Sequence, residues 1–165
     1  MKKSPVSKTS ISFQEIKNLG ADPRELEAFK QITQTNNQIP FSNIVKFCRL
    51  MKKFELEAFL LSRYVELTIG MLNEGANLHV NEDSAFRRAC ALGHTEVVKL
   101  LIDRDADIDH HGMEGLWYAT IRGNVPLTKL LLENGVVIDE TTRNYALTKE
   151  CAPKIRKILT SWHLR

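Results

Sequence analysis

An alternating series of acidic residues is the first group in this sequence whose spacing could bind an ion. Asp103, Asp105 and Asp107 alternate, and Glu114 stands at the twelfth place counted from Asp103, which is the carboxylate spacing of an EF-hand calcium loop. Such a loop needs glycine at its sixth place for a sharp turn, and this chain has Ile108 there. We therefore predict that the series is no calcium site and that the chain binds no metal.

A pair of histidines is the second group that could do chemistry. His110 and His111 could ligate a transition metal, with Cys90 and His79 as conceivable companions. Adjacent residues of an extended hairpin point to opposite sides, however, so the pair would be a poor chelate. We expect both side chains to be solvated or to contact a partner. We expect His94 to be a structural residue at the start of a helix rather than a general base.

Catalytic motifs do not occur in the sequence. It contains no glycine-rich phosphate loop, no H-E-x-x-H, no nucleophile elbow and no paired C-x-x-C. We therefore predict no enzymatic activity and no cofactor. The three cysteines, Cys48, Cys90 and Cys151, lie far apart, which fits a reducing compartment, and we expect a cytoplasmic protein.

Composition indicates one soluble domain. The chain has 165 residues, of which 43% are hydrophobic and 26% charged, and residues 4–12 lack the apolar core of a signal peptide. A formal net charge of +3 gives no reason to expect nucleic acid or a membrane surface. The alternative is an accessory binder of nucleic acid or of an anionic surface that uses the basic chain ends. Those ends contain Lys2, Lys3, Lys8, Lys154, Arg156, Lys157 and Arg165.

An internal repeat carries more information than any of these motifs. A shift of thirty residues brings the segment 75–78 onto 105–108 and then onto 135–138, and brings 89–94 onto 119–124. A period of roughly 20 to 50 residues is typical of stacked, identical supersecondary units. The sequence therefore predicts a repeat protein.

Each period has the pattern of two helices. Apolar residues from Ala85 to Cys90 recur at i, i+1, i+4 and i+5, and the more hydrophobic run 97–102 follows them. Gly93 separates the two segments, where a residue with positive φ ends the first helix at little cost. Asp105 replaces the glycine that ends the second helix in the other copies, so we expect it in a left-handed conformation and predict that Asp105→Gly raises the thermal midpoint.

The segments 84–90, 93–94, 96–101 and 106–108 resemble the signature of the ankyrin repeat, which reads T-P-L-H-x-A-A, G-H, E-V-V-x-L-L and G-A-D-V-N. The resemblance implies an all-α fold, an ankyrin-repeat solenoid of stacked helix-turn-helix units with short hairpin loops and divergent terminal capping helices. The expected organisation is a flexible tail (1–10), a divergent N-terminal helical cap (11–53), repeats over 54–139 (about 54–80, 81–109 and 110–139) and a C-terminal capping repeat (140–165).

The same resemblance implies a function. Ankyrin stacks bind other proteins on a concave face, so we expect a monomeric, non-catalytic protein-protein interaction module with a protein partner, without nucleic acid or membrane. Small, degenerate ankyrin proteins resemble those of intracellular bacteria and large viruses, which suggests an effector or adaptor in the cytosol of a host cell.

The resemblance implies a binding face, which we transfer from the family to this sequence position by position. It contains residues before and along the first helices of the repeats. Trp, Tyr and Arg dominate interaction hot spots. Trp117 either contacts the partner or is half-buried packing, and Arg88 and Tyr118 either contact the partner or bridge to an adjacent repeat. The predicted partner-binding residues are Asn81, Asp83, Arg87, Arg88, Leu92, His110, His111, Met113, Trp117, Tyr118 and Arg122.

Overall fold

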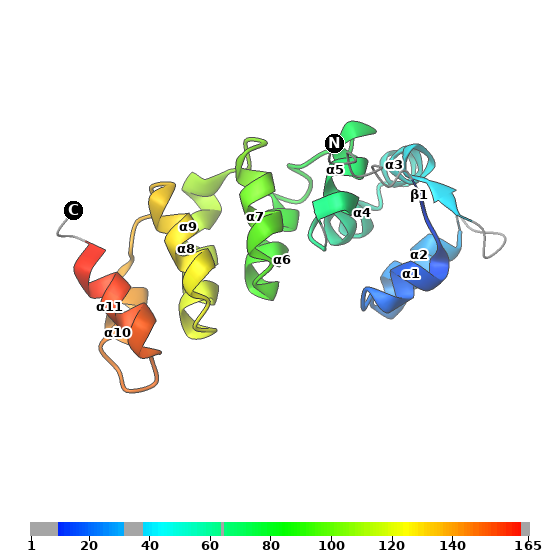
Figure 1. Ribbon diagram of the computed structural model, residues 1–165. Helices are drawn as coiled ribbons and strands as arrows, with labels where there is room; N and C mark the ends of the chain where they lie inside the picture. Colours follow the sequence, from blue (N-terminus) through cyan, green and yellow to red (C-terminus); the bar gives the residue numbers. More distant parts are fainter. Residues whose placement is uncertain (1–9, 32–37, 64, 163–165) are drawn as a thin grey trace, which may run out of the picture. The chain divides into compact units, whose positions relative to one another are not determined.

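The structure is a computed structural model that describes residues 10–31, 38–63 and 65–162. The described part is mostly helical, with eleven helices and a single pair of two-residue strands (Figure 1). The chain forms two compact units, Met1–Ala85 and Phe86–Arg165, and the boundary falls inside helix α6 (Ser84–Leu92). None of the helices in these described ranges combines the length and apolar character needed to span a bilayer.

The first unit begins with a short strand, which pairs with a second short strand that follows two helices. Strand β1 (Ser10–Ile11) runs antiparallel to β2 (Ile39–Pro40), with Ile11 opposite Ile39. The helices of this unit are α1 (Phe13–Asn18), α2 (Pro23–Lys30), α3 (Phe41–Leu50), α4 (Phe54–Leu61) and α5 (Val65–Asn73).

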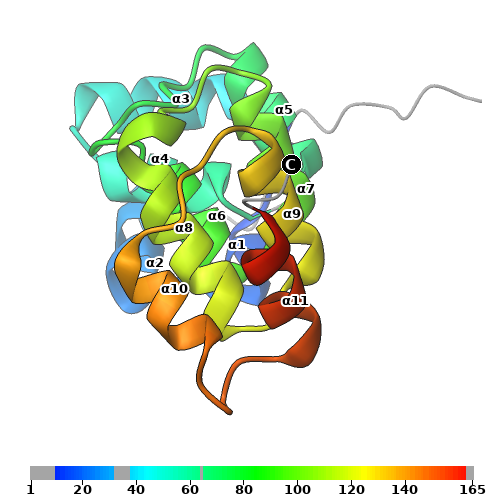
Figure 2. The ribbon, with the colours of Figure 1, turned by 90° about the vertical axis from the view of Figure 1, so that its left-hand side faces the viewer.

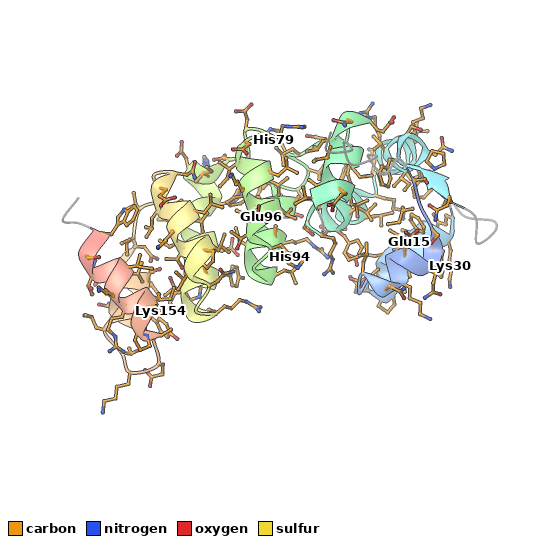
Figure 3. The ribbon with its side chains drawn as sticks, viewed as in Figure 1. Glu15, Lys30, His79, His94, Glu96 and Lys154 are labelled. Carbon is orange, nitrogen blue, oxygen red and sulfur yellow. The ribbon has the colours of Figure 1, made fainter. Side chains whose placement is uncertain are left out.

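Capping boxes fix where α1 and α2 begin. The Ser12 hydroxyl accepts a hydrogen bond from the Glu15 backbone N–H at 3.2 Å, and the Glu15 carboxylate accepts one from the Ser12 N–H at 2.7 Å. Figure 3 labels Glu15. Asp22 and Glu25 form the same reciprocal pair at the start of α2. Each box satisfies backbone donors that a short helix would otherwise leave without acceptors.

Helix α4 is the centre of the first unit. Most of its residues are apolar and buried, and α2, α3 and α5 each pack against it. The core around α4 contains Phe29, Phe41, Phe59, Leu56 and Leu60, each at most 1% exposed. Burial of these large side chains supplies most of the hydrophobic stabilisation of the unit.

The second unit consists of helix pairs, which confirms the predicted all-α repeat fold. After α6 come α7 (Thr95–Ile102), α8 (Ile108–Ile121), α9 (Val125–Glu133), α10 (Glu140–Ala146) and α11 (Pro153–Ser161). Helix α8 packs against α9 and α10, and α11 packs against α9 and α10 (Figures 1 and 2).

The turns between paired helices repeat at the level of single hydrogen bonds. The His94 backbone N–H donates to the Ala89 carbonyl at 3.0 Å, and the Asn124 N–H donates to the Ala119 carbonyl at 2.9 Å. A glycine occupies the same position in both turns. Gly93 has a φ of 75°, and Gly123, thirty residues later, has a φ of 67°. The positive φ that was predicted for Gly93 is confirmed.

The second helix of each repeat also ends in one recurring turn. The Ala106 N–H donates to the Leu101 carbonyl at 3.0 Å, and the equivalent bond joins Val136 to Leu131 at 3.1 Å. Asp105 stands in this turn with φ of 68°, so its predicted left-handed conformation is confirmed. The other two copies have glycine there, with φ of 84° and 90°.

The segment before the third predicted repeat differs from the expected extended hairpin. His110 and His111 lie in the first turns of α8, so the extended conformation predicted for them is wrong. The Asp107 side chain accepts a hydrogen bond from the His110 N–H at 3.0 Å and caps the helix one turn earlier than the repeat pattern suggested. Gly112 is tolerated inside this helix because methyl groups of Val136 and Ile108 fill the space that a side chain would need.

Candidate functional site

A close approach of α6 and α8 determines how their surface side chains are spaced. A Cβ atom at Gly115 would lie 2.9 Å from Cys90 Sγ and 3.5 Å from Leu131 Cδ1. Only glycine fits between these neighbours without displacing them. The first helices of two successive repeats therefore stand side by side in the second unit, and their solvent-facing residues share one surface.

The surface of α8 carries large apolar side chains that remain accessible. Met113 is 44% exposed and Ile121 is 40% exposed, with Trp117 and Tyr118 half-buried between them. Positions 113, 117 and 121 follow the i, i+4, i+8 spacing of one helix face, and Arg122 is exposed beside them. The sequence prediction missed Ile121 because it followed the variable positions of the family signature. The helical spacing from Met113 would have found it.

Trp117 packs against the next helix pair. Its ring meets the ring of Tyr145 in α10 edge to face, with 5.4 Å between centroids and 76° between planes. Such a pair stabilises a helix contact beyond the apolar area that it buries. The contact favours half-buried packing over direct partner contact, the two roles that the sequence left open for Trp117.

Helix α6 contributes the other part of this surface. Leu92 is 40% exposed at the end of the helix, and Arg87 and Arg88 are half-buried. Leu92 stands thirty residues before Arg122, so the two ends of the surface present equivalent positions of successive repeats. We use the name α6–α8 surface for Arg88, Leu92, Met113, Tyr118, Ile121 and Arg122.

His110 and Asp107 form a local capping arrangement. His110 Nδ1 lies 2.9 Å from Asp107 Oδ2, in addition to the backbone hydrogen bond described above. That backbone hydrogen bond, followed by the charges of His110 and His111, lowers the pKa of the Asp107 carboxyl. The carboxylate is thus engaged at the start of α8. Within the described residues, no group of three or more His, Cys, Asp or Glu side chains comes close enough to hold a metal ion.

Two predicted contact residues, Asn81 and Asp83, lie in the first unit. Asn81 Nδ2 donates to Glu55 Oε1 at 2.6 Å. Asp83 is only 2% exposed, and its carboxylate lies 2.7 Å from Nδ1 of His79, which Figure 3 labels on the loop before α6. A buried carboxylate has little surface to offer a partner, so the α6–α8 surface does not include Asp83.

The basic C-terminal helix α11 belongs to the alternative hypothesis of binding to nucleic acid or an anionic surface. One of its basic side chains, Arg156, forms hydrogen bonds within the protein. Arg156 donates to the carbonyls of Ala146 at 3.2 Å, Thr148 at 2.5 Å and Cys151 at 3.2 Å, which ties the loop between α10 and α11 to the helix. Lys154 is exposed in the first turn of α11 (Figure 3). Lys2, Lys3, Lys8 and Arg165 lie outside the described residues.

Comparison with known proteins identifies the repeat. The family model for ankyrin repeats in three copies matches residues 58–142, just over half of the chain. These boundaries contain α5 to α9 entire, with the recurring turns described above. The chain therefore belongs to the ankyrin-repeat family.

Relatives with similar segments are far longer. The ankyrin repeat and KH domain-containing protein mask of Drosophila melanogaster is 34% identical over 80 residues, which is 44% of this chain and 2% of that protein. The human ankyrin repeat and KH domain-containing protein 1 is 37% identical over 80 residues, which is 44% of this chain and 3% of that protein. This chain thus spans a very small part of these relatives. No solved structure matches it.

Proposed function

We propose that this protein is a non-catalytic adaptor or inhibitor that binds another protein through the α6–α8 surface of its second unit. Ankyrin-repeat proteins generally act as interaction modules without catalysis, and the matched family supports that class of function. The observation that supports the proposed position is the exposure of Met113 and Ile121, at 44% and 40%, on one face of α8. Large apolar groups that stay in water are typical of contact surfaces.

The partner that fits this surface has apolar side chains bordered by carboxylates. Tyr118 lies between the two apolar residues in the sequence, and Arg122 is exposed at the end of α8. Tyrosine and arginine contribute strongly to protein interfaces because they bring a large area or bidentate hydrogen bonds. A cytoplasmic location belongs to the same proposal, since the thiols of Cys48, Cys90 and Cys151 are buried and unpaired. A role as a delivered effector rests on the family resemblance alone.

The experiment is an affinity capture with matched variants. The variant Tyr118→Ala, Ile121→Ser, Arg122→Ala removes the centre of the surface and leaves the Trp117–Tyr145 packing in place. The control is Val137→Ser, which removes an apolar side chain that is 68% exposed elsewhere in the second unit. We expect the wild type and the control to recover the same proteins and the triple variant to lose them, at equal helicity by circular dichroism. Identical recovery by all three would place the contact elsewhere.

A further inference from the structure

A local cluster of basic residues lies in a segment without acidic residues, although the net charge of the chain is small. Between Glu27 and Glu55 the sequence contains no aspartate or glutamate, whereas Lys46, Arg49, Lys52 and Lys53 fall within eight residues of one another. The formal charge of the whole chain is only +3 because acidic residues elsewhere balance them. This local excess of positive charge is independent of the α6–α8 surface and lies in the first unit.

The same segment exposes large apolar side chains. Leu50 at the end of α3 is 80% exposed, Met51 is 54% exposed, and Phe54 at the start of α4 is 37% exposed. Helix α3 directs a different face into the core, where Ile44 and Cys48 are fully buried. We use the name basic-apolar turn for Lys46, Leu50, Met51, Lys52, Lys53 and Phe54.

Backbone hydrogen bonds hold this turn in one conformation. The Met51 N–H donates to the Phe47 carbonyl at 2.9 Å, and the Lys53 N–H donates to the Cys48 carbonyl at 2.8 Å. Lys52 completes the helix end with φ of 51°, a left-handed conformation that glycine would adopt more easily. The chain therefore keeps a cation where backbone energetics favour glycine, which is the kind of local strain that often accompanies function.

Within the described residues, the carboxylates that follow the turn in the sequence form no ion pair with its lysines. Glu55 accepts a hydrogen bond from Asn81, and Glu57 is 3% exposed. Across the described ranges of the chain, Lys46, Lys52 and Lys53 take part in no ion pair. Arg49 differs, because its Nη2 donates to the Gly75 carbonyl at 3.0 Å and thereby fixes the end of α3 to the end of α5.

We propose that the basic-apolar turn binds the surface of a bilayer that contains anionic phospholipid. Clusters of basic residues beside apolar side chains are attracted to anionic headgroups, and lysine stems can lie along the interface with their ammonium groups at the phosphates. Leu50 and Met51 project into solvent, so they can enter the interfacial region without a matching pocket. The proposal differs from the expectation, based on net charge, that the chain does not contact membranes.

Other polyanions fit the turn less well. Single-stranded nucleic acids are recognised through aromatic stacking as well as phosphate contacts, but the most exposed apolar residues here, Leu50 and Met51, are not aromatic. An acidic protein would have to present an apolar surface of matching shape to Leu50, whose side chain is 80% exposed. A bilayer needs no such complementary shape.

Vesicle co-sedimentation of the full chain tests the proposal. The vesicles are phosphatidylcholine alone, or phosphatidylcholine with one fifth phosphatidylserine. We expect binding only to the phosphatidylserine vesicles at about 0.1 M NaCl, and loss of binding at about 1 M, where the Debye length falls from about 10 Å to about 3 Å. No binding to the phosphatidylserine vesicles, or binding that salt does not weaken, overturns the proposal.

Variants locate the binding surface. Lys52→Gly removes a charge and suits the left-handed backbone, so the thermal midpoint should not fall, while affinity for the anionic vesicles should drop about fivefold. The double variant Leu50→Ser, Met51→Ser should weaken vesicle binding further. Leu147→Ser, at a side chain 70% exposed in the second unit, should leave it unchanged. Unchanged vesicle binding by either variant of the turn contradicts the proposal. The proposal is also contradicted if the chain binds poly-glutamate as tightly as the anionic vesicles and the double variant does not weaken that binding.

Discussion

Asp105 is a single residue whose backbone conformation is poorly suited to its side chain. Its φ of 68° is left-handed, and its side chain is exposed. We predict that Asp105→Gly raises the free energy of unfolding by about 0.5 to 1 kcal/mol, since relief of the left-handed strain exceeds the entropy that glycine adds to the unfolded chain. Urea denaturation measures the change. The control Asp103→Gly, at a right-handed position with φ of −62°, should lower stability by a similar amount. A fall for both variants would contradict the strain argument.

Two buried threonines of the second unit differ in whether their hydroxyl groups have partners. Thr120 is 1% exposed and its Oγ1 has no hydrogen-bond partner among the described residues, whereas Thr128 is fully buried and its Oγ1 donates to the Asn124 carbonyl at 2.9 Å. Thr120→Val should therefore stabilise the fold by about 1 kcal/mol, because it replaces an unsatisfied hydroxyl with a methyl group of the same size. Thr128→Val should destabilise it by about the same amount. Thermal midpoints of the two variants that shift in the same direction would contradict this prediction.

Glu57 joins α4 to the segment after α5 through a hydrogen bond from Asn77, and the free energy of burying its carboxyl depends on pH. Burial raises the pKa of its carboxyl, and the hydrogen bond from the Asn77 N–H at 2.8 Å and the charge of Arg49 lower it less. A carboxyl whose folded pKa exceeds its unfolded pKa stabilises the fold most at low pH, and this contribution is lost as pH rises through the folded pKa.

Glu57→Gln should consequently be more stable than the wild type at neutral pH, because the amide oxygen keeps the hydrogen bond from Asn77 without the buried charge. The gain should vanish as the pH falls well below about 4.3, where the carboxyl is protonated in both the folded and the unfolded chain. Urea unfolding of the wild type and the variant across this range measures the difference. Glu66→Gln, at an exposed carboxylate on α5, controls for the loss of one negative charge. A difference between Glu57→Gln and wild type that is constant with pH would argue against a cost of burying charge.

At the scale of elements, the contact between α6 and α8 depends on the absence of a side chain. An alanine Cβ at Gly115 would meet Cys90 Sγ at 2.9 Å, so Gly115→Ala should destabilise the chain by about 1 to 3 kcal/mol. In a Cys90→Ala background the sulfur is gone and the same substitution should cost less. A double-mutant cycle by chemical denaturation measures the coupling. Additive effects would mean that the two positions do not compete for space.

The repeat could be predicted from the sequence, but its irregular parts could not. Periodic apolar positions and the glycine at 93 define α6 to α9, because each is a local property of the chain. The early part of α8 brings Gly112 against the methyl groups of Val136, which lie in a distant segment. The Trp117–Tyr145 contact likewise joins α8 to α10, where the thirty-residue pattern has faded. Such contacts come from tertiary packing and leave no periodic signal.

At the scale of the whole molecule, the two compact units contain separate reporters of unfolding. Cys48 lies in the first unit and Cys151 in the second, and both thiols are at most 1% exposed. Burial, followed by the charge of Glu57, raises the pKa of Cys48 to about 12, and burial raises that of Cys151. Neither thiol should react with iodoacetamide in the native state, because the thiolate is the reactive form.

These thiols can show whether the units unfold together. Repeat proteins are stabilised mainly by contacts between neighbouring segments, so a local defect can melt one part and spare another. We predict that Gly115→Ala lowers the urea concentration at which Cys151 becomes alkylated and leaves that of Cys48 unchanged. Pulsed alkylation followed by peptide mass spectrometry measures both midpoints in one sample. Equal shifts of the two midpoints would instead show that α6, which continues across the boundary between the units, couples them into one cooperative block.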